Sequence, residues 1–275
     1  MGRDAALYLN SHGYTVFAGD IETADGDELI EAADRPDALL PIQLDVTSDA
    51  QVADAVVAVK ERIGVGAKLV GLFSNAGIAG FDDDVSSEGM SMERLERILE
   101  VDFLGGVRFI RGFLPILRAS RGTVVINSAL MAQTVIPFNG GYAAAKCALE
   151  GWADSLRREI APLGVRVVLI EAAAVATNLG ARQSPEAIPT DTPYRTMAPM
   201  VKFFLGTQAK IDSKPGASPR RVSEIVKHAL EARRPKTRYT VGVGARPISL
   251  LGRLPDKIQD KIMLAGLKRI ASKAP

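Results

Sequence analysis

Hydrophobic segments of two kinds alternate along the first 178 residues of this chain. Short, largely apolar stretches such as KLVGLFS (68–74) and GTVVINSA (122–129) have the length and composition of strands buried on both faces. Between them stand longer stretches in which apolar residues recur every three or four positions, as on one side of a helix. This alternation predicts a doubly wound, Rossmann-type parallel sheet with helices on both faces and right-handed crossovers.

The same pattern sets the expected element boundaries. Strands are predicted at 15–18, 39–48, 68–77, 122–129, 165–177 and 238–244, and helices at 3–12, 49–64, 91–120, 140–164, 218–235 and 254–271. Ser91 and Ser218 stand where a side-chain oxygen can cap the first turn of a helix. Gly13 and Gly64 stand where a helix can end in a residue with positive φ.

A proline-rich segment interrupts the alternation after residue 177. The stretches SPEAIPTDTPYRTMAP (184–199) and SKPGASP (213–219) cannot continue a helix or an inner strand. Long irregular segments often cover a binding site. We therefore expect a single domain, residues 1–275, with a core at 1–178, a lid at 179–220 and a helix-strand-helix extension at 221–275.

Composition excludes several classes of protein. The chain is 47% hydrophobic and 24% charged, which is typical of a folded globular protein and argues against disorder. No apolar run is long enough to span a bilayer, and no signal-peptide segment opens the sequence. A single cysteine, Cys147, excludes an internal disulfide and fits a reducing compartment. We expect a cytoplasmic protein, with peripheral membrane association left open.

The net charge of +2 conceals an asymmetry between the two ends of the chain. Residues 195–275 hold 18 Lys and Arg against 5 Asp and Glu, whereas the preceding residues hold 16 against 27. A basic segment of this kind can bind nucleic acid, an acidic partner or an anionic lipid surface, the last through the amphipathic helix at 254–271, or it can be a solvated charged face. Nucleic acid is not an expected partner, because no aromatic residues are interleaved with the charges.

Tyr142 and Lys146 stand four residues apart near the start of the helix at 140–164. This spacing places both side chains on one helical face, where an ammonium favours ionisation of a phenol that otherwise titrates near pH 10. The helix follows a strand, and open α/β sheets bind ligands at the carboxyl ends of their strands. The pair alone is a weak signal, but its position predicts an acid–base site at this edge of the sheet.

Several further motifs accompany the pair: LDVTS (44–48), SNAG (74–77), RGTVVINSA (121–129), YAAAKCALEGWADSLRREIAPLGVRV (142–167) and VATNL (175–179). With these motifs the chain resembles the short-chain dehydrogenase/reductase family over nearly its whole length. The segments ALEARRPKTRYTVGVGA and LPDKIQDKI resemble the branch that contains hydroxysteroid and retinol dehydrogenases. The resemblance implies an NAD(P)-dependent oxidoreductase.

The resemblance assigns a role to each matching residue. Tyr142 would be the general acid/base that exchanges a proton with a carbonyl or alcohol oxygen during hydride transfer. Lys146 would favour the phenolate and hold the cofactor ribose. The cofactor-binding positions implied in this way are Gly2, Asp20, Asp45, Val46, Asn75, Ala76, Gly77, Tyr142, Lys146, Val175 and Thr177.

The type of coenzyme depends on Asp20, which follows the first predicted strand. A carboxylate there would accept both ribose hydroxyls and repel a 2′-phosphate, which favours NAD over NADP. Asp20 as a turn residue and Asp45 as a helix cap are the structural alternatives.

Four departures from the family pattern fall on cofactor or catalytic positions, and two of them concern the sheet. The family begins with a strand and a Gly-rich turn, whereas here Gly2 matches the last glycine of that turn. The first strand is therefore expected to be missing, so that either the natural chain is longer or another segment replaces that strand. The Pro-Gly expected in the segment at 165–177 is Ala172-Ala173.

The other two departures concern catalysis. The serine position of the family is Ala129. The adjacent Ser128 is the candidate replacement, although successive strand residues face opposite sides unless a bulge re-aims one of them. The position usually filled by Asn is Asp102, whose carboxylate would stabilise the Lys146 ammonium and change the proton relay. The expected catalytic set is thus Tyr142, Lys146, Asp102 and Ser128, with no metal.

Two functions are open at this point. The first is an oxidoreductase that interconverts a secondary alcohol and a ketone on a lipophilic, steroid- or retinoid-like substrate, with activity impaired by the departures. The lipophilic character of the substrate is inferred from the resemblance to the hydroxysteroid and retinol dehydrogenase branch and from apolar lid residues, namely Met197, Met200, Phe203 and Phe204. The second is a catalytically inactive scaffold that binds a small molecule or a partner. A homodimer or homotetramer through the helices at 92–118 and 141–161 is expected from the family.

Overall fold

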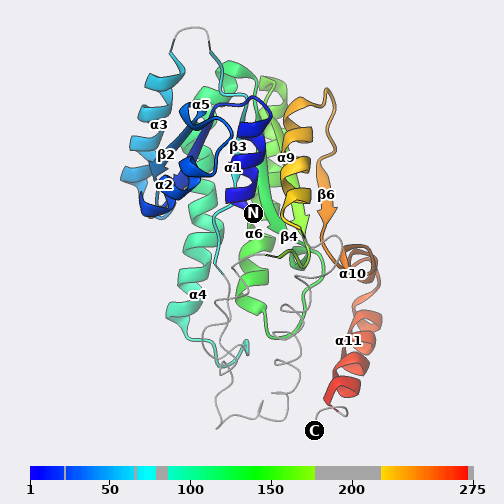
Figure 1. Ribbon diagram of the computed structural model, residues 1–275. Coiled ribbons are helices and arrows are strands. Elements are labelled where there is room, and N and C mark those ends of the chain that lie inside the picture. The colour runs from blue at the N-terminus through cyan, green and yellow to red at the C-terminus, as the bar shows by residue number, and fades with distance from the viewer. Residues whose placement is uncertain (22, 65–66, 79–85, 177–217, 272–275) are drawn as a thin grey trace.

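The computed structural model of the chain describes residues 1–21, 23–64, 67–78, 86–176 and 218–271. Within these residues the strands are β1 (Val16–Asp20), β2 (Leu39–Gln43), β3 (Gly71–Ser74), β4 (Thr123–Ala129), β5 (Arg166–Ala172) and β6 (Arg238–Val241). All strand pairs are parallel, and helices cover both faces (Figure 1). The prediction of a doubly wound, Rossmann-type α/β fold is confirmed.

The helices follow the predicted order, with two additions. They are α1 (Gly2–Ser11), α2 (Thr23–Glu31), α3 (Asp49–Ile63), α4 (Met92–Leu99), α5 (Gly106–Ser120), α6 (Gly140–Ile160), α9 (Arg220–Glu231), α10 (Ala245–Leu251) and α11 (Asp256–Ala271). Ser91 caps α4 as predicted, by accepting the Arg94 backbone N–H. Gly13 and Gly64 take φ values of 93° and 62°, which glycine adopts readily. Neither α2 nor α10 was predicted, because both are short and interrupted by Gly or Pro.

The predicted helix at 91–120 contains a wider turn. Residues Glu100–Gly105 form a π-helical turn, η2, between α4 and α5. Gly105 lies so close to Val46 that a Cβ there would come within 2.7 Å of the Val46 Cγ2 atom. Turns of this type occur frequently at functional sites because the extra residue changes the direction of nearby side chains. Shorter 3-10 turns lie at η1 (Pro36–Ala38), η3 (Leu130–Ala132) and η4 (Ala161–Leu163).

Two apolar cores lie on opposite faces of the strands, because side chains alternate along each strand. Val124 and Ile126 of β4 pack in the core formed with α3, α5 and α6. Val125, between them, packs in the core formed with α1 and α9. This alternation determines which way the last residues of β4 face.

The strands form two sheets rather than one. β1 pairs with β2, whereas β3, β4, β5 and β6 form a second sheet in that order. Phe17 of β1 nevertheless packs against the same core as Leu72 of β3, so the helical layer continues across the interruption. The interruption lies where the missing first strand was expected, and none of the described residues forms a strand that replaces it.

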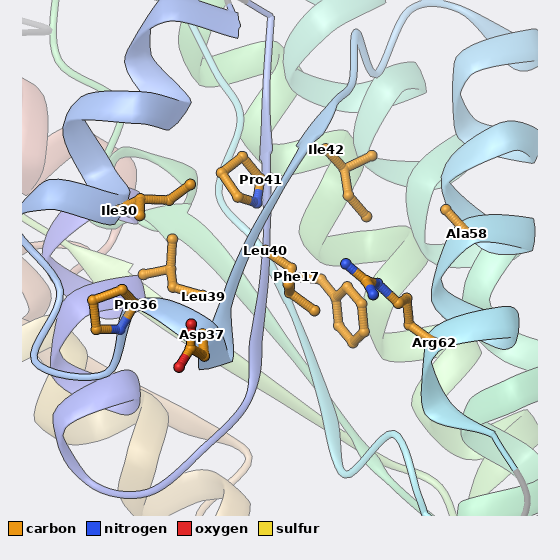
Figure 2. Close-up of a pocket in the computed structure, with 10 residues that line it drawn as sticks. All are labelled: Phe17, Ile30, Pro36, Asp37, Leu39, Leu40, Pro41, Ile42, Ala58 and Arg62. Atoms are coloured by element: carbon orange, nitrogen blue, oxygen red, sulfur yellow. The ribbon is translucent and has the colours of Figure 1, made fainter.

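A hollow of about 560 Å³ lies at the free edge of β2. Figure 2 shows Ile30 and Pro41 on one side of this strand and Ile42 and Ala58 on the other. Pro41 lacks a backbone donor, which suits an edge strand. None of the residues expected for catalysis lines the hollow, so the candidate site lies elsewhere.

Candidate active site

Tyr142 and Lys146 form one unit on the first turns of α6, which follows the carboxyl end of β4. The Lys146 Nζ atom lies 5.3 Å from the centroid of the Tyr142 ring. The start of α6 packs closely against neighbouring segments, since a Cβ on Gly141 would come within 2.9 Å of the Met90 Sδ atom. The lysine side chain is only 4% exposed. The structure therefore brings the predicted pair together, with Lys146 buried and Tyr142 half-buried.

Asp102 joins this pair from η2. Its Oδ2 atom lies 3.6 Å from Lys146 Nζ, and its side chain is fully buried. Its Oδ1 atom accepts a hydrogen bond of 2.7 Å from the Ile78 backbone N–H. The sequence predicted a carboxylate beside Lys146, and the structure places it in contact with the ammonium and with the turn that follows β3.

The three ionisable groups change one another's pKa values. Burial raises the pKa of Asp102, and attraction to Lys146 offsets only part of that rise. Burial disfavours the Lys146 ammonium, but Tyr142 and Asp102 outweigh it and raise the pKa of Lys146. Burial raises the pKa of Tyr142, Lys146 lowers it and Asp102 raises it again, with a net rise. Lys146 thus acts on the phenol in the predicted direction, but burial and Asp102 outweigh it.

Ser128 does not join the group, which corrects its place in the expected catalytic set. Its hydroxyl donates a hydrogen bond of 2.7 Å to Glu150 Oε1, and both residues are buried. The β4–β5 register is continuous through Ala129, so no bulge re-aims the Ser128 side chain. Ala129, the last residue of β4, is buried and offers only a methyl group.

Glu150 belongs to a buried ionic cluster that the sequence reasoning missed. Arg238 of β6 reaches three carboxylates, those of Glu171 at 2.9 Å, Asp154 at 3.1 Å and Glu150 at 3.4 Å. The cluster therefore joins α6 to β4, β5 and β6 directly behind the Tyr142–Lys146 pair. One sequence signal was available: Glu150 follows Lys146 by one helical turn, on a face expected to be buried.

The loops at the strand ends bring Gly2, Asn75 and Gly77 close to the buried group. Asn75 Oδ1 accepts a hydrogen bond of 3.1 Å from Asn127 Nδ2. A Cβ on Gly2 would lie 2.9 Å from Asn75 Nδ2, and a Cβ on Gly77 would lie 3.1 Å from Asp102 Oδ1. Gly77 and Ala76 are exposed, whereas Asn75 is half-buried. Only glycine leaves room for these backbone approaches.

The two acidic positions expected to contact the cofactor differ in their surroundings. Asp20 ends β1, is exposed, and accepts the Ile21 backbone N–H at 2.7 Å. Asp45 accepts the backbone N–H and the hydroxyl of Thr47 at 2.8 and 2.7 Å, and these hydrogen bonds lower its pKa. Asp45 is thus occupied in a turn that precedes α3, but the N-cap of that helix is Ser48, which accepts the Gln51 backbone N–H. Asp20 stays accessible.

The remaining predicted positions are partly described. Val46 is buried beneath Gly105, and Val175 is buried beyond the end of β5. Thr177 and the apolar lid residues at 197–204 lie outside the described residues. Among the described residues, no group of His, Cys, Asp and Glu side chains is arranged to hold a metal ion.

Comparisons with known proteins agree with this geometry. Residues 1–187 match the family model described as short chain dehydrogenase. Retinol dehydrogenase 5 of Mus musculus is 31% identical over 282 residues, which cover 98% of this chain and 86% of the relative. Mitochondrial D-beta-hydroxybutyrate dehydrogenase of Mus musculus is 32% identical over 252 residues, with coverages of 86% and 72%. The match to a retinol dehydrogenase agrees with the predicted branch.

A solved structure supports the same assignment. The chain superimposes on a short-chain dehydrogenase from Streptomyces avermitilis with a TM-score of 0.74 and 25% identity, over 100% of this chain and 94% of the other. Fold, family model and relatives of similar length therefore coincide. The chain belongs to the short-chain dehydrogenase/reductase family.

Proposed function

We propose that the protein is an NAD(P)-dependent oxidoreductase that interconverts a secondary alcohol and a ketone, with Tyr142 as its general acid/base. The observation that carries the proposal is the Tyr142–Lys146–Asp102 group, in which the half-buried phenol lies beside a buried ion pair, next to the exposed turn at Gly77. A phenol beside an ammonium that a carboxylate holds in place can move a proton to or from a bound oxygen. Membership of the family supports this chemistry.

The residues at the strand ends fit a dinucleotide. The first turn of α1, beginning at Gly2, offers unpaired backbone N–H groups that favour a phosphate. Because Gly77 has no side chain, its backbone beside Lys146 is open to close approach by the dinucleotide. Asp20 is exposed and is proposed to accept ribose hydroxyls, which favours NAD over NADP. When bound, the nicotinamide ring would supply or accept a hydride.

The protein's own residues would handle the proton. In reduction, the Tyr142 phenol donates its proton to the substrate oxygen, and in oxidation the phenolate takes it back. Lys146 supplies the positive charge that a phenolate needs, and Asp102 fixes the position of that charge. Ala129 offers no hydroxyl to the developing oxyanion, so turnover is expected to be slower than with a serine there.

Two relatives point to different substrate classes. Similarity to a retinol dehydrogenase and the apolar residues of the lid favour a lipophilic, steroid- or retinoid-like alcohol or ketone. Similarity to a D-beta-hydroxybutyrate dehydrogenase favours a small hydroxy acid. We propose the lipophilic class, a homodimer or homotetramer through α4, α5 and α6, and a cytoplasmic location with peripheral membrane contact.

Coenzyme binding is the first test. Titration with NADH or NADPH should raise the thermal midpoint, since a ligand at 100 times its Kd stabilises the folded state by about 2.7 kcal/mol. NADH should bind more tightly than NADPH because of Asp20. Tyr142→Phe should bind NADH equally well and lose turnover on a panel of ketones. If neither coenzyme shifts the midpoint at millimolar concentration, the oxidoreductase proposal is wrong.

A non-catalytic binding protein is the second candidate, and Ala129 is the observation that favours it. A protein of this kind would show no turnover on the panel, whether or not it binds coenzyme. Measurable turnover by the wild type would exclude it, whereas turnover by Ala129→Ser alone would trace the lost activity to residue 129.

A further inference from the structure

Lys146 lies between two groups that compete for its charge. Its Nζ atom is 3.6 Å from Asp102 Oδ2 and 5.3 Å from the centroid of the Tyr142 ring. The Ile78 backbone N–H holds the other carboxylate oxygen at 2.7 Å, so the carboxylate cannot turn away without losing that bond. No hydrogen bond reaches Asp102 Oδ2 from the described residues, which leaves the ammonium as the compensating charge for a buried carboxylate.

The net charge of the group therefore depends on the state of the phenol. With Tyr142 protonated, the ammonium and the carboxylate cancel. With Tyr142 ionised, the group carries one net negative charge, in a place where the Lys146 and Asp102 side chains are 4% and 0% exposed and Tyr142 is half-buried. Uncompensated charge is costly at such burial. An amide at position 102 would instead leave a neutral phenolate–ammonium pair.

Other charges facing the group do not change this conclusion. Among the described residues, Lys146 and Asp102 are the charged groups that act on Tyr142. Arg94 of α4 also faces Asp102, and of the groups that act on the pKa of Asp102 its effect is the smallest.

We propose that Asp102 sets the direction in which the site works at neutral pH, by keeping Tyr142 protonated so that it donates to a carbonyl. This inference rests on the function proposed above. In the favoured direction, the carbonyl carbon receives a hydride from the reduced coenzyme while its oxygen receives the Tyr142 proton. The phenolate then regains a proton from water. Alcohol oxidation needs the phenolate first, and therefore runs only at alkaline pH; the overall equilibrium is unchanged.

Titration of Tyr142 tests the inference without substrate. The chain has five tyrosines, which can be labelled with ¹³C at Cζ, and the signal absent from Tyr142→Phe belongs to Tyr142. In the wild type, with and without NADH, we expect no ionisation of Tyr142 below about pH 9, although a free phenol is roughly one-tenth ionised there. In Asp102→Asn, ionisation should begin at clearly lower pH.

A matched control variant accompanies these titrations, and one of the decisive outcomes does not require that Asp102→Asn folds. Glu100→Gln removes a carboxylate from the same turn, but one that pairs with Arg108 at 3.0 Å instead of Lys146, and should leave the Tyr142 titration unchanged. Ionisation of wild-type Tyr142 below about pH 9 would overturn the proposal even if Asp102→Asn fails to fold. An unchanged Tyr142 titration in a folded Asp102→Asn variant would also overturn the proposal.

Kinetics test the direction itself. Since the phenolate fraction falls tenfold for each pH unit below the pKa, Asp102→Asn should raise kcat for alcohol oxidation at pH 7.5 by about threefold or more. The ratio of kcat for oxidation at pH 7.5 to kcat for ketone reduction at pH 6 should rise by at least the same factor, because the phenol is already protonated at pH 6. If the titration moves but the pH profile of oxidation does not, Asp102 does not set the direction. If the proposed function itself is wrong, turnover will be absent while Tyr142 titrates as predicted in the wild type and in Asp102→Asn.

Discussion

Ala129 is the residue at which a substitution is expected to raise the rate. It ends β4, is buried, and stands at the position where the family has a serine hydroxyl. The neighbouring hydroxyl of Ser128 is bound to Glu150 and is not available to a substrate. The site is therefore expected to polarise a substrate oxygen through Tyr142 alone.

Restoring the hydroxyl should restore part of the rate. Because one donor to a developing oxyanion typically contributes about 10²- to 10³-fold, Ala129→Ser should raise kcat by up to that factor. Steady-state kinetics on the ketone panel measure the change. Ser128→Ala is the control: it should lower the free energy of unfolding by about 1–3 kcal/mol, because Glu150 loses a buried donor, and change kcat little. If Ser128→Ala instead lowered kcat by a factor of that size, then Ser128, and not residue 129, would stand at the position of the family's serine hydroxyl.

At the scale of elements, the position of α6 depends on contacts that are ionic as well as apolar. Leu149, Ala153 and Leu156 pack in the core beneath the sheet. Arg238 adds a second attachment, since its guanidinium contacts carboxylates of both α6 and β5. Burial raises the pKa of Glu150, and the opposing effects of Ser128 and Arg238 do not cancel the rise.

Arg238→Met should destabilise the fold by about 3 kcal/mol or more, because it leaves buried carboxylates without their cation. The loss should depend on pH. A carboxyl group with a raised pKa in the folded state takes up a proton on folding, so its contribution to stability falls as pH rises towards that pKa. Without Arg238 the pKa of Glu150 rises further, and the loss should be larger at pH 8 than at pH 5. Denaturant unfolding at both values measures it, and a loss independent of pH would contradict this account.

At the scale of the whole molecule, charge is distributed unevenly. The basic residues of the last third of the chain include Lys257, Lys261 and Lys268 of α11, which occurs at one corner of the molecule (Figure 1). The same helix exposes Ile258 and Ile262, with 45% and 49% of their surfaces accessible. None of the described helices has the length and apolarity to cross a bilayer.

Binding to lipid vesicles should therefore be electrostatic. We expect the protein to sediment with vesicles that contain phosphatidylserine at low salt, and not with neutral phosphatidylcholine vesicles. Binding should weaken in about 0.5 M salt, where the screening length falls to a few ångström. The triple variant Lys257→Glu, Lys261→Glu and Lys268→Glu should not bind. Binding that resists salt, or none at all, would favour the alternative of a solvated basic face.

Most of the fold could be predicted from the sequence, because it depends on local periodicity. The uniformly apolar stretch at β4 requires burial on both faces, and the three-to-four spacing in α6 requires a helix with one buried side. The pairing of Tyr142 with Lys146 followed from helical spacing alone. The sequence predicted Ser128 as a catalytic residue. The structure instead gives its side chain a specific long-range partner, Glu150, which no local pattern reveals.

By itself, the sequence determined most of the strands and helices and placed Tyr142 and Lys146 on one helical face, since short-range spacing controls both. Only the tertiary structure decided the electrostatic state of the site. Asp102 and Lys146 are distant in sequence, and only the folded chain buries the carboxylate 3.6 Å from the ammonium, beside the Tyr142 ring. Likewise, only the packing of β6 against α6 brings Arg238 to Glu150, because an ion pair between remote segments exists only once the intervening chain is folded.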